Sequence, residues 1–273
     1  MTKNFAPEIE RALALADPSW HDILRHALHA LDTAFPDYLP QLLSSAFLPT
    51  QDRLFAAFTQ PLENVRWILV GEGPYPRAAS ATGYCFMDGA VGSLWQQGGG
   101  LSKAVNRATS LRNLMKMLLV AGGALQADQL NPHNMAAISA RACAPGSGMT
   151  QTLAAFQERM HACGFLLLNA SLVFREEVAP ALEARPWQVF FLQLLQDLHA
   201  ACAQRGQALP CLILWGKIAA RLQALPQVQA FPQRQAEHPY NLSFIQNRDM
   251  QQLFAPFNLL GLPTGNQAPL TKT

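Results

Sequence analysis

Polar and aromatic side chains follow the ends of several apolar segments in this sequence. Glu72, Tyr75 and Phe86 come shortly after the first segment, Asn169 lies late in the second, and His238 ends the fourth, which is weaker. If these segments are parallel strands of one sheet, their carboxyl ends meet at the edge where ligands of such folds bind. An amide, an imidazole, a tyrosine and a phenylalanine would then converge on a single crevice.

Each of these residues has a simpler interpretation when it is taken alone. A single Asn in a strand is more often a buried polar group with satisfied hydrogen bonds, and a His before Pro is usually a turn residue. Their placement at the ends of successive strands favours a ligand site.

The apolar pattern predicts the elements that would position these side chains. Helical spacing of apolar residues alternates with short apolar runs, which is typical of a parallel sheet covered on both faces by helices. We therefore expect an α/β fold with three α/β/α layers and a central four-stranded parallel sheet. The predicted strands are residues 65–71, 164–174, 210–216 and 234–238.

Capping residues and prolines predict the helix boundaries. Two helices are expected before the first strand: an amphipathic helix from Trp20 to Leu31, which ends before Pro36, and a second helix over 38–47. Three more are expected after it: a helix capped by Ser110 and ended by Gly122 and Gly123, a helix from Thr150 to Cys163, and a long helix opened by Pro186 and running through Gln204.

Two glycine-containing segments resemble nucleotide-binding loops without having the required spacing. GEGPYP (71–76) lacks the third glycine of the dinucleotide fingerprint, and its two prolines supply no amides for a pyrophosphate. GGGLSK (98–103) lacks the spacing of a phosphate-binding loop, so a flexible surface loop is expected there.

Five motifs, in this order, resemble those of the uracil-DNA glycosylase superfamily, and in particular its conventional uracil-DNA glycosylase branch. The resemblance extends from about Trp20 to Leu260 and includes the lead-in segment 49–58. The matching segments are GEGPYP (71–76) with GYCF (83–86) for the family's GQDPYH and G-x-C-F, SLRN (110–113) for S-L-x-N, LLLN (166–169) for LLLN, ILWG (213–216) for LLWG, and HPYNLS (238–243) for H-P-S-P-L-S.

No linker in the sequence would split the chain, so we expect a single domain over residues 1–261, followed by a flexible tail over 262–273. The resemblance implies a monomeric DNA glycosylase of base-excision repair without a cofactor. Its partner would be uracil-containing or damaged DNA, single- or double-stranded, from which it flips the base before hydrolysing the N-glycosidic bond.

The resemblance also assigns roles to individual residues. On that basis Phe86 stacks on the base, Asn169 recognises its edge, and Tyr75 excludes a methyl group at C5. Among the catalytic residues, His238 stabilises the departing base and Glu72 is the carboxylate of the first motif. The residues expected to contact DNA outside the base are the wedge Leu242 and, at phosphates, Ser110, Arg112 and Ser243.

The first motif departs from the family pattern at the position of its water-activating Asp, which is Gly73 here. The family's following His is Pro76, and Glu72 is the only carboxylate in the motif. Two hypotheses therefore stay open: a glycosylase with reduced activity, and a relative that binds DNA or a free base without turnover. An unrelated parallel α/β domain would leave the five ordered motifs unexplained.

Composition sets broad limits on these hypotheses. The 273 residues are 50% apolar and carry a formal net charge of +2, which permits nucleic-acid binding without requiring it. Five cysteines without C-x-x-C spacing argue against a zinc ribbon, an iron–sulfur cluster and a disulfide scaffold. Glu8 and Glu10 lie where a signal peptide would be apolar, and no apolar run suggests a membrane span, so a cytoplasmic protein is expected.

Overall fold

The structure, a computed structural model, describes residues 4–50 and 52–263. The contacts between residues divide the chain into two compact units. Unit 1 comprises Met1–Ala90 and His161–Gln235, and unit 2 comprises Val91–Met160 and Ala236–Thr273. The single domain over residues 1–261 stays a prediction, and residues 264–273 of the predicted tail lie outside the described residues.

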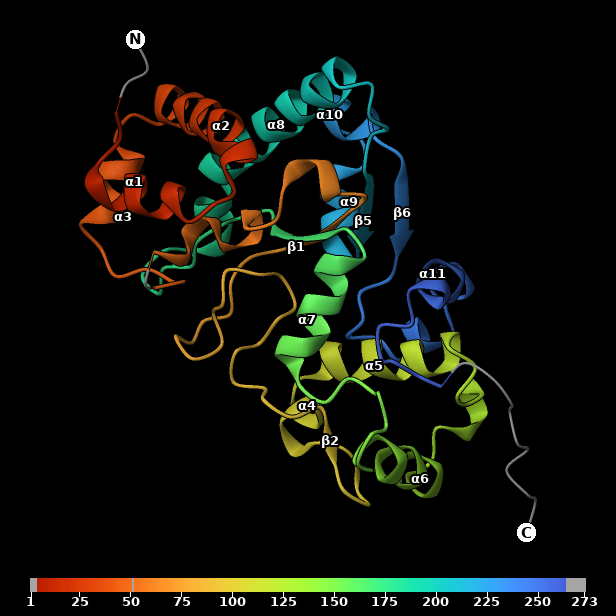
Figure 1. Ribbon diagram of the computed structural model, residues 1–273. Coiled ribbons are helices and arrows are strands. Elements are labelled where there is room, and N and C mark those ends of the chain that lie inside the picture. Colours follow the sequence, from red (N-terminus) through yellow and green to blue (C-terminus); the bar gives the residue numbers. More distant parts are fainter. Residues whose placement is uncertain (1–3, 51, 264–273) are drawn as a thin grey trace. The chain divides into compact units, whose positions relative to one another are not determined.

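Unit 1 is built on a four-stranded sheet with the strand order β4-β1-β5-β6 (Figure 1). The central strand β1 pairs in parallel with both β4 and β5. These elements confirm the predicted α/β fold with its four-stranded parallel sheet, and β6 begins one residue before the predicted segment. The strands are β1 (Trp67–Gly71), β4 (Phe165–Asn169), β5 (Cys211–Trp215) and β6 (Gln233–Ala236).

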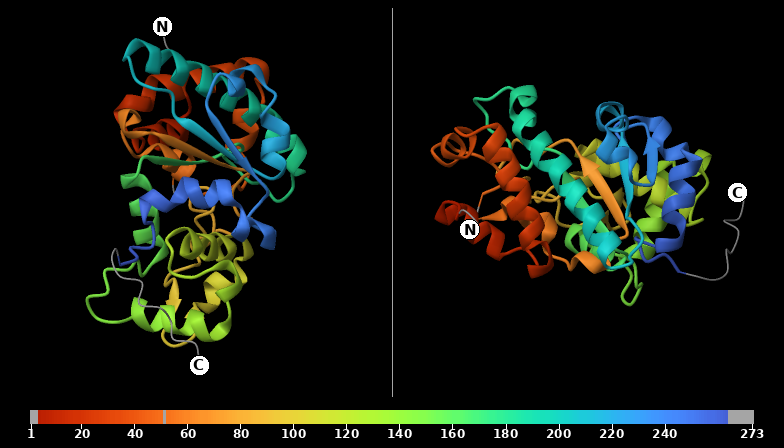
Figure 2. Two further views of the ribbon diagram at one scale, coloured as in Figure 1. Left: turned by 90° about the vertical axis from the view of Figure 1, so that its right-hand side faces the viewer. Right: turned by 90° about the horizontal axis from the view of Figure 1, so that it is seen from above.

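One face of this sheet carries the main apolar core of unit 1. Because side chains alternate along a strand, Ile68 and Val70 point to the same face, together with alternate residues of β4 and β5. Residues of α2 and α8, which lie side by side, complete this core (Figure 2). The helices of unit 1 are α1 (Pro7–Ala14), α2 (His21–Ala34), α3 (Tyr38–Leu43), α8 (Pro180–Gln204), α9 (Lys217–Leu222) and α10 (Pro226–Gln229).

The predicted amphipathic helix is α2, whose apolar positions are buried and which ends at Ala34, before Pro36. The second predicted helix is shorter than expected, because α3 ends at Leu43 instead of residue 47. Two serine hydroxyls end it: Ser44 donates to the Gln41 carbonyl and Ser45 to the Leu42 carbonyl, each at 2.9 Å. Such side-chain bonds compete with continued helix.

The long helix α8 begins at Pro180, so the prediction that Pro186 opens it is wrong. The backbone N–H groups of Leu182 and Glu183 both donate to the Ala179 carbonyl, which marks the first helical turn. Pro180 therefore occupies the first helical position, where a missing N–H costs nothing, and Pro186 is accommodated inside the helix. Although α8 has 25 residues, no helix in the described ranges is long and apolar enough to cross a membrane.

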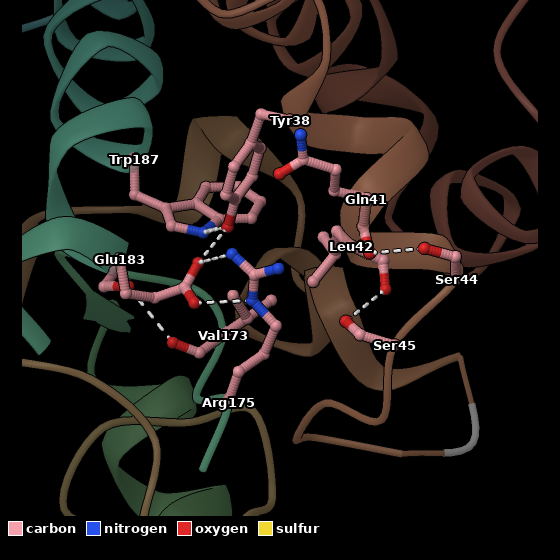
Figure 3. A network of polar contacts seen from close by, with 10 residues as sticks. Tyr38, Gln41, Leu42, Ser44, Ser45, Val173, Arg175, Glu183 and Trp187 are labelled. Carbon is pink, nitrogen blue, oxygen red and sulfur yellow. Dashed lines mark hydrogen bonds and ion pairs between the residues drawn. The ribbon is translucent and has the colours of Figure 1, made fainter. Parts of the chain in front are cut away.

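A buried polar network joins α3 to α8 (Figure 3). The Glu183 carboxylate is 3% exposed and accepts hydrogen bonds from the Tyr38 hydroxyl and from the Arg175 guanidinium, whose Nε lies 2.7 Å from Oε2. The Trp187 indole N–H donates to the same Tyr38 oxygen at 2.6 Å. Burial and the nearby carboxylate raise the pKa of the Tyr38 phenol. Each buried polar group in this network therefore has a hydrogen-bonding partner.

Unit 2 is mainly helical and contains a short antiparallel hairpin of β2 and β3. The hairpin corrects the prediction of a flexible loop over 98–103, because Gly100 and Leu101 are buried and Gly100 N–H donates to the Ser139 hydroxyl at 2.9 Å. Its strands have only two residues each, too few to show alternation in the sequence. The elements are β2 (Trp95–Gln96), β3 (Gly100–Leu101), α4 (Lys103–Arg107), α5 (Thr109–Ala121), α6 (Pro132–Ala142), α7 (Leu153–Ala162) and α11 (Arg248–Phe254).

Ser110 does not cap a helix, because α5 already begins at Thr109 and follows Ala108. The capping hydroxyl of this region belongs to Ser102, which accepts from the Val105 N–H at 3.2 Å and starts α4. The predicted helix end is confirmed, since α5 stops at Ala121 before the two glycines.

Thr150 does not cap α7 either. Its buried hydroxyl donates to the Leu259 carbonyl at 2.9 Å, so it is engaged in tertiary structure. Thr152 takes the capping position instead and accepts from the Ala155 N–H at 3.1 Å. Thr150 and Thr152 are equally suitable capping residues by type. The hydrogen bond from Thr150 to Leu259 leaves the capping position to Thr152.

Candidate active site

The carboxyl ends of β1, β4 and β5 lie side by side, as the sequence predicts. Gly71 at the end of β1 pairs in register with Asn169 at the end of β4. The backbone pairing continues past the strands, because Ala170 N–H donates to the Gly71 carbonyl at 2.8 Å and Ser171 N–H to the Glu72 carbonyl at 3.1 Å. The start of the GEGPYP segment is thereby fixed against β4.

The Asn169 side chain lies directly against Gly71. A Cβ atom at position 71 would approach Asn169 Oδ1 to 2.5 Å and Cys85 Cβ to 2.6 Å, closer than packed atoms allow. Glycine at position 71 therefore makes room for the amide, which is 3% exposed. The amide and the GYCF segment both meet at the end of β1.

Cys85 fixes the GYCF segment to the sheet, a role that the sequence did not indicate. Its N–H donates to the Leu167 carbonyl of β4 at 3.2 Å, and its Sγ–H to the Leu69 carbonyl of β1 at 3.1 Å. Burial raises the pKa of this thiol, so it stays a neutral hydrogen-bond donor.

Phe86, the next residue, has a left-handed backbone with φ of +60°. Such a conformation costs a non-glycine residue about 1–3 kcal/mol and persists where surrounding structure enforces it. The Phe86 ring packs edge-on against Trp215 at the end of β5, with ring centroids 5.1 Å apart and planes at 66°. The strained turn therefore directs an aromatic ring to the ends of the strands.

Tyr75 follows Pro74 in the GEGPYP segment and is partly buried. Burial, reinforced by the negative charge of Asp88, raises the pKa of its phenol to about 12. The hydroxyl is therefore protonated at neutral pH and presents a neutral side chain.

The Glu72 carboxylate is largely exposed and pairs with Arg221 of α9, which donates from Nη2 to Oε1. Both residues line a cavity of about 520 Å³ within unit 1. The wall of this cavity also includes Gly73, Pro74 and Ser171. The only carboxylate of the first motif thus lies beside a guanidinium.

Gly73, which replaces the family's Asp, has room for a side chain. A Cβ at this position would lie 3.7 Å from the Ser171 carbonyl oxygen, an ordinary van der Waals distance, and the backbone is not left-handed. Neither close approach nor a positive φ requires glycine here.

The other predicted residues lie in unit 2, on α5 and on the segment 238–243. Asn113 of α5, fully buried, connects them: its Nδ2 donates to the Pro239 carbonyl at 2.7 Å and to the Tyr240 carbonyl at 3.3 Å. Arg112 Nε in turn donates to Asn113 Oδ1 at 3.2 Å. Asn113 was not predicted as a site residue, although it is the last residue of the SLRN motif.

His238 begins the same segment and is partly buried. Its Nδ1 accepts the Tyr240 N–H at 3.1 Å, which leaves the proton of the neutral imidazole on Nε2. The carbonyl of His238 accepts the Asn241 N–H at 2.9 Å. Leu242 and Ser243, the predicted wedge and phosphate ligand, are both exposed.

Charge is unevenly divided between the two units. Unit 2 contains eight Lys and Arg against four Asp and Glu, a formal net charge of +4. Unit 1 contains 12 against 14, a formal net charge of −2. Ser110, Arg112 and Ser243, predicted to bind phosphates, thus belong to the unit that carries the excess positive charge.

Comparisons with known proteins agree with the motif pattern. The sequence matches no protein-family model. The structure of wild-type UNG from Nitratifractor salsuginis superposes with a TM-score of 0.81 at 35% identity and covers 94% of this chain and 99% of that chain. The uracil-DNA glycosylase of Thermobifida fusca is 29% identical over 210 residues, 76% of this chain and 72% of that protein.

A third similarity is local. Over 74 residues the chain is 36% identical to the uracil-DNA glycosylase of Mycobacteroides abscessus, a match that spans 26% of this chain and 32% of that protein. The similarity to the Nitratifractor structure, by contrast, extends over nearly the whole of both chains. The chain therefore belongs to the uracil-DNA glycosylase superfamily.

Proposed function

We propose that this protein is a DNA glycosylase that flips uracil, or a related damaged base, out of DNA and hydrolyses its N-glycosidic bond. The observation that carries the proposal is a stacking ring and an amide at one sheet edge: Phe86 packs on Trp215, and Asn169 lies against Gly71. A flipped base needs both, because it is held by stacking on its face and by hydrogen bonds to its edge.

The proposed roles follow from this arrangement and from membership of the superfamily. Phe86 stacks on the base, Asn169 donates and accepts along its edge, and Tyr75 excludes the C5 methyl group of thymine. In unit 2, His238 stabilises the negative charge of the departing base, a role of the oxyanion-hole type. Leu242 enters the base stack, while Ser110, Arg112 and Ser243 bind phosphates.

Glu72 is proposed to take over the task of the missing Asp. Cleavage of the glycosidic bond builds positive charge on the sugar and negative charge on the base, and a carboxylate can offset the first or orient the attacking water. Because Glu72 is one position early in the motif and pairs with Arg221, we expect excision to be slower than in relatives that retain the Asp.

Excision from defined oligonucleotides tests the proposed function. Single- and double-stranded DNA with one uracil is incubated with the protein, and alkali then cleaves the strand at any abasic site. Cleavage at uracil, and none at thymine in a matched strand, supports a glycosylase. If the protein binds the single- and double-stranded DNA but leaves no abasic sites, the alternative hypothesis is favoured: a member of the superfamily that has lost the Asp and binds DNA without turnover.

Asn169→Asp should weaken discrimination for uracil. The carboxylate can no longer donate, so it places an acceptor where the amide offered a hydrogen to the base. A lost hydrogen bond of this kind is worth about 1–3 kcal/mol, and the measurement is the ratio of excision rates for uracil and cytosine. An unchanged ratio in a folded variant would remove Asn169 from base recognition.

DNA affinity should fall as salt rises, because phosphate binding releases counterions. Arg112→Gln removes one proposed phosphate contact and should lower the slope of log Kd against log salt by about 1. Arg112→Lys is the matched control: it also loses the Nε bond to Asn113 but keeps the charge, so its slope should equal that of the wild type. Salt-independent binding would contradict the proposed phosphate contacts.

A further inference from the structure

Two large apolar side chains project from one short segment of unit 2. Tyr240 and Leu242 are each 67% exposed and are separated by a single residue. Among the described residues, the only other exposed large apolar side chains are Leu15 and Leu182, which lie far apart in the sequence. Exposing two such side chains together leaves apolar surface in water, which is typical of a binding surface.

The segment that carries them is held in place by hydrogen bonds to its backbone. Asn113, buried in α5, donates to the carbonyls of Pro239 and Tyr240, and His238 Nδ1 accepts the Tyr240 N–H. The next residue, Asn241, donates its N–H to the His238 carbonyl. The Tyr240 side chain is thus exposed on an ordered backbone, which lowers the entropy cost of binding.

We propose that Tyr240 is a second stacking residue, which places its ring on the face of a DNA base while Leu242 enters the stack. This inference rests on the proposed function, because it requires DNA as the partner. An aromatic ring presented on a fixed segment, in a unit with a net charge of +4, suits a base face attached to phosphates. Tyr240 would therefore bind DNA directly and take no part in bond cleavage.

Two base faces are available when a nucleotide is extruded. One belongs to the neighbouring base in the same strand and exists in single- and double-stranded DNA. The other belongs to the base left opposite the gap and exists only in a duplex. The stacking chemistry is the same for both, and the two forms of DNA distinguish them.

The test measures binding without requiring excision. Fluorescein-labelled oligonucleotides that contain a tetrahydrofuran abasic-site analogue, single-stranded and duplex, are titrated with the full chain at fixed salt. Tyr240→Ala should weaken binding about 5- to 150-fold, the range expected for loss of one stacked base. Tyr240→Phe should bind within about twofold of the wild type, because the ring is kept. Leu182→Ala, an equally simple truncation of an exposed side chain in unit 1, should have no effect.

The outcomes separate the stacking role from the proposed function. A loss in both forms of DNA assigns the neighbouring base, and a loss in the duplex alone assigns the opposite base. If the wild type binds and Tyr240→Ala binds equally well, the stacking role is wrong while the proposed function stands. A Tyr240→Phe variant as weak as Tyr240→Ala would likewise overturn stacking in favour of a hydroxyl contact. A wild type that binds neither probe contradicts both proposals.

Discussion

Glu72→Gln should lower the rate of uracil excision by about 10²–10⁴-fold, the contribution typical of a positioned general base. The substitution preserves the size of the side chain and its ability to accept a hydrogen bond, and it removes the charge and the basicity. Single-turnover excision from a uracil-containing duplex measures the effect without interference from product release. An unchanged rate would show that the Glu72 carboxylate does not take part in excision.

One further variant, Arg221→Gln, separates two possible causes of this effect. Arg221→Gln breaks the ion pair and leaves the carboxylate in place. If the pair merely shaped the cavity, Arg221→Gln would slow excision as much as Glu72→Gln does. If the carboxylate itself acts, Arg221→Gln should retain most of the activity.

Gly73→Asp tests whether the family's own carboxylate position can still work. The nearest atom to a Cβ there, the Ser171 carbonyl oxygen, is 3.7 Å away, so a Cβ at position 73 meets no clash. In the Glu72→Gln background, Gly73→Asp should restore part of the rate. A silent Glu72→Gln together with a folded Gly73→Asp that gains nothing would show that neither position supplies the catalytic carboxylate.

Glu183→Ala should reduce the free energy of unfolding by about 3–5 kcal/mol, because it leaves a buried cation without its partner. The Arg175 side chain is only 11% exposed and pairs with Glu183 through Nε. The Tyr38 hydroxyl, which donates to the same carboxylate, would lose its acceptor as well. Urea denaturation followed by tryptophan fluorescence measures the change.

The matched control is an ion pair of the same chemistry nearer the surface. Arg25 binds Glu10 through two guanidinium nitrogens, and the two side chains are 28% and 29% exposed. Glu10→Ala should therefore cost at most about 1 kcal/mol. Equal losses for Glu10→Ala and Glu183→Ala would show that burial does not set the cost.

The sequence predicted the sheet and the adjacent carboxyl ends of its strands, because both follow from local pattern. β1, β4 and β5 are continuous apolar runs, and a parallel sheet brings their carboxyl ends together. The position of Asn169 beside the end of β1 follows from that arrangement alone.

The supporting contacts could not be predicted, because they join residues far apart in the chain. Asn113 and Pro239 are 126 positions apart, and Glu72 and Arg221 are 149 apart. An Asn within a helix gives no local sign of a carbonyl partner elsewhere. The start of α8 was misassigned for a different reason: a proline is compatible with the first helical position at 180 as well as at 186, and only the hydrogen bonds from Leu182 and Glu183 to Ala179 show that the helix begins at Pro180.

The hydrogen bond from Cys85 to β1 has a practical consequence for measuring local motion. A thiol that is buried and kept protonated reacts with alkylating reagents only when its surroundings open. Cys202 of α8 is also buried, in the core of unit 1, whereas Cys143, Cys163 and Cys211 are more accessible. If Cys85 is labelled faster than Cys202, the end of β1 opens in a local fluctuation. If the two rates agree, the end of β1 opens only when the core unfolds.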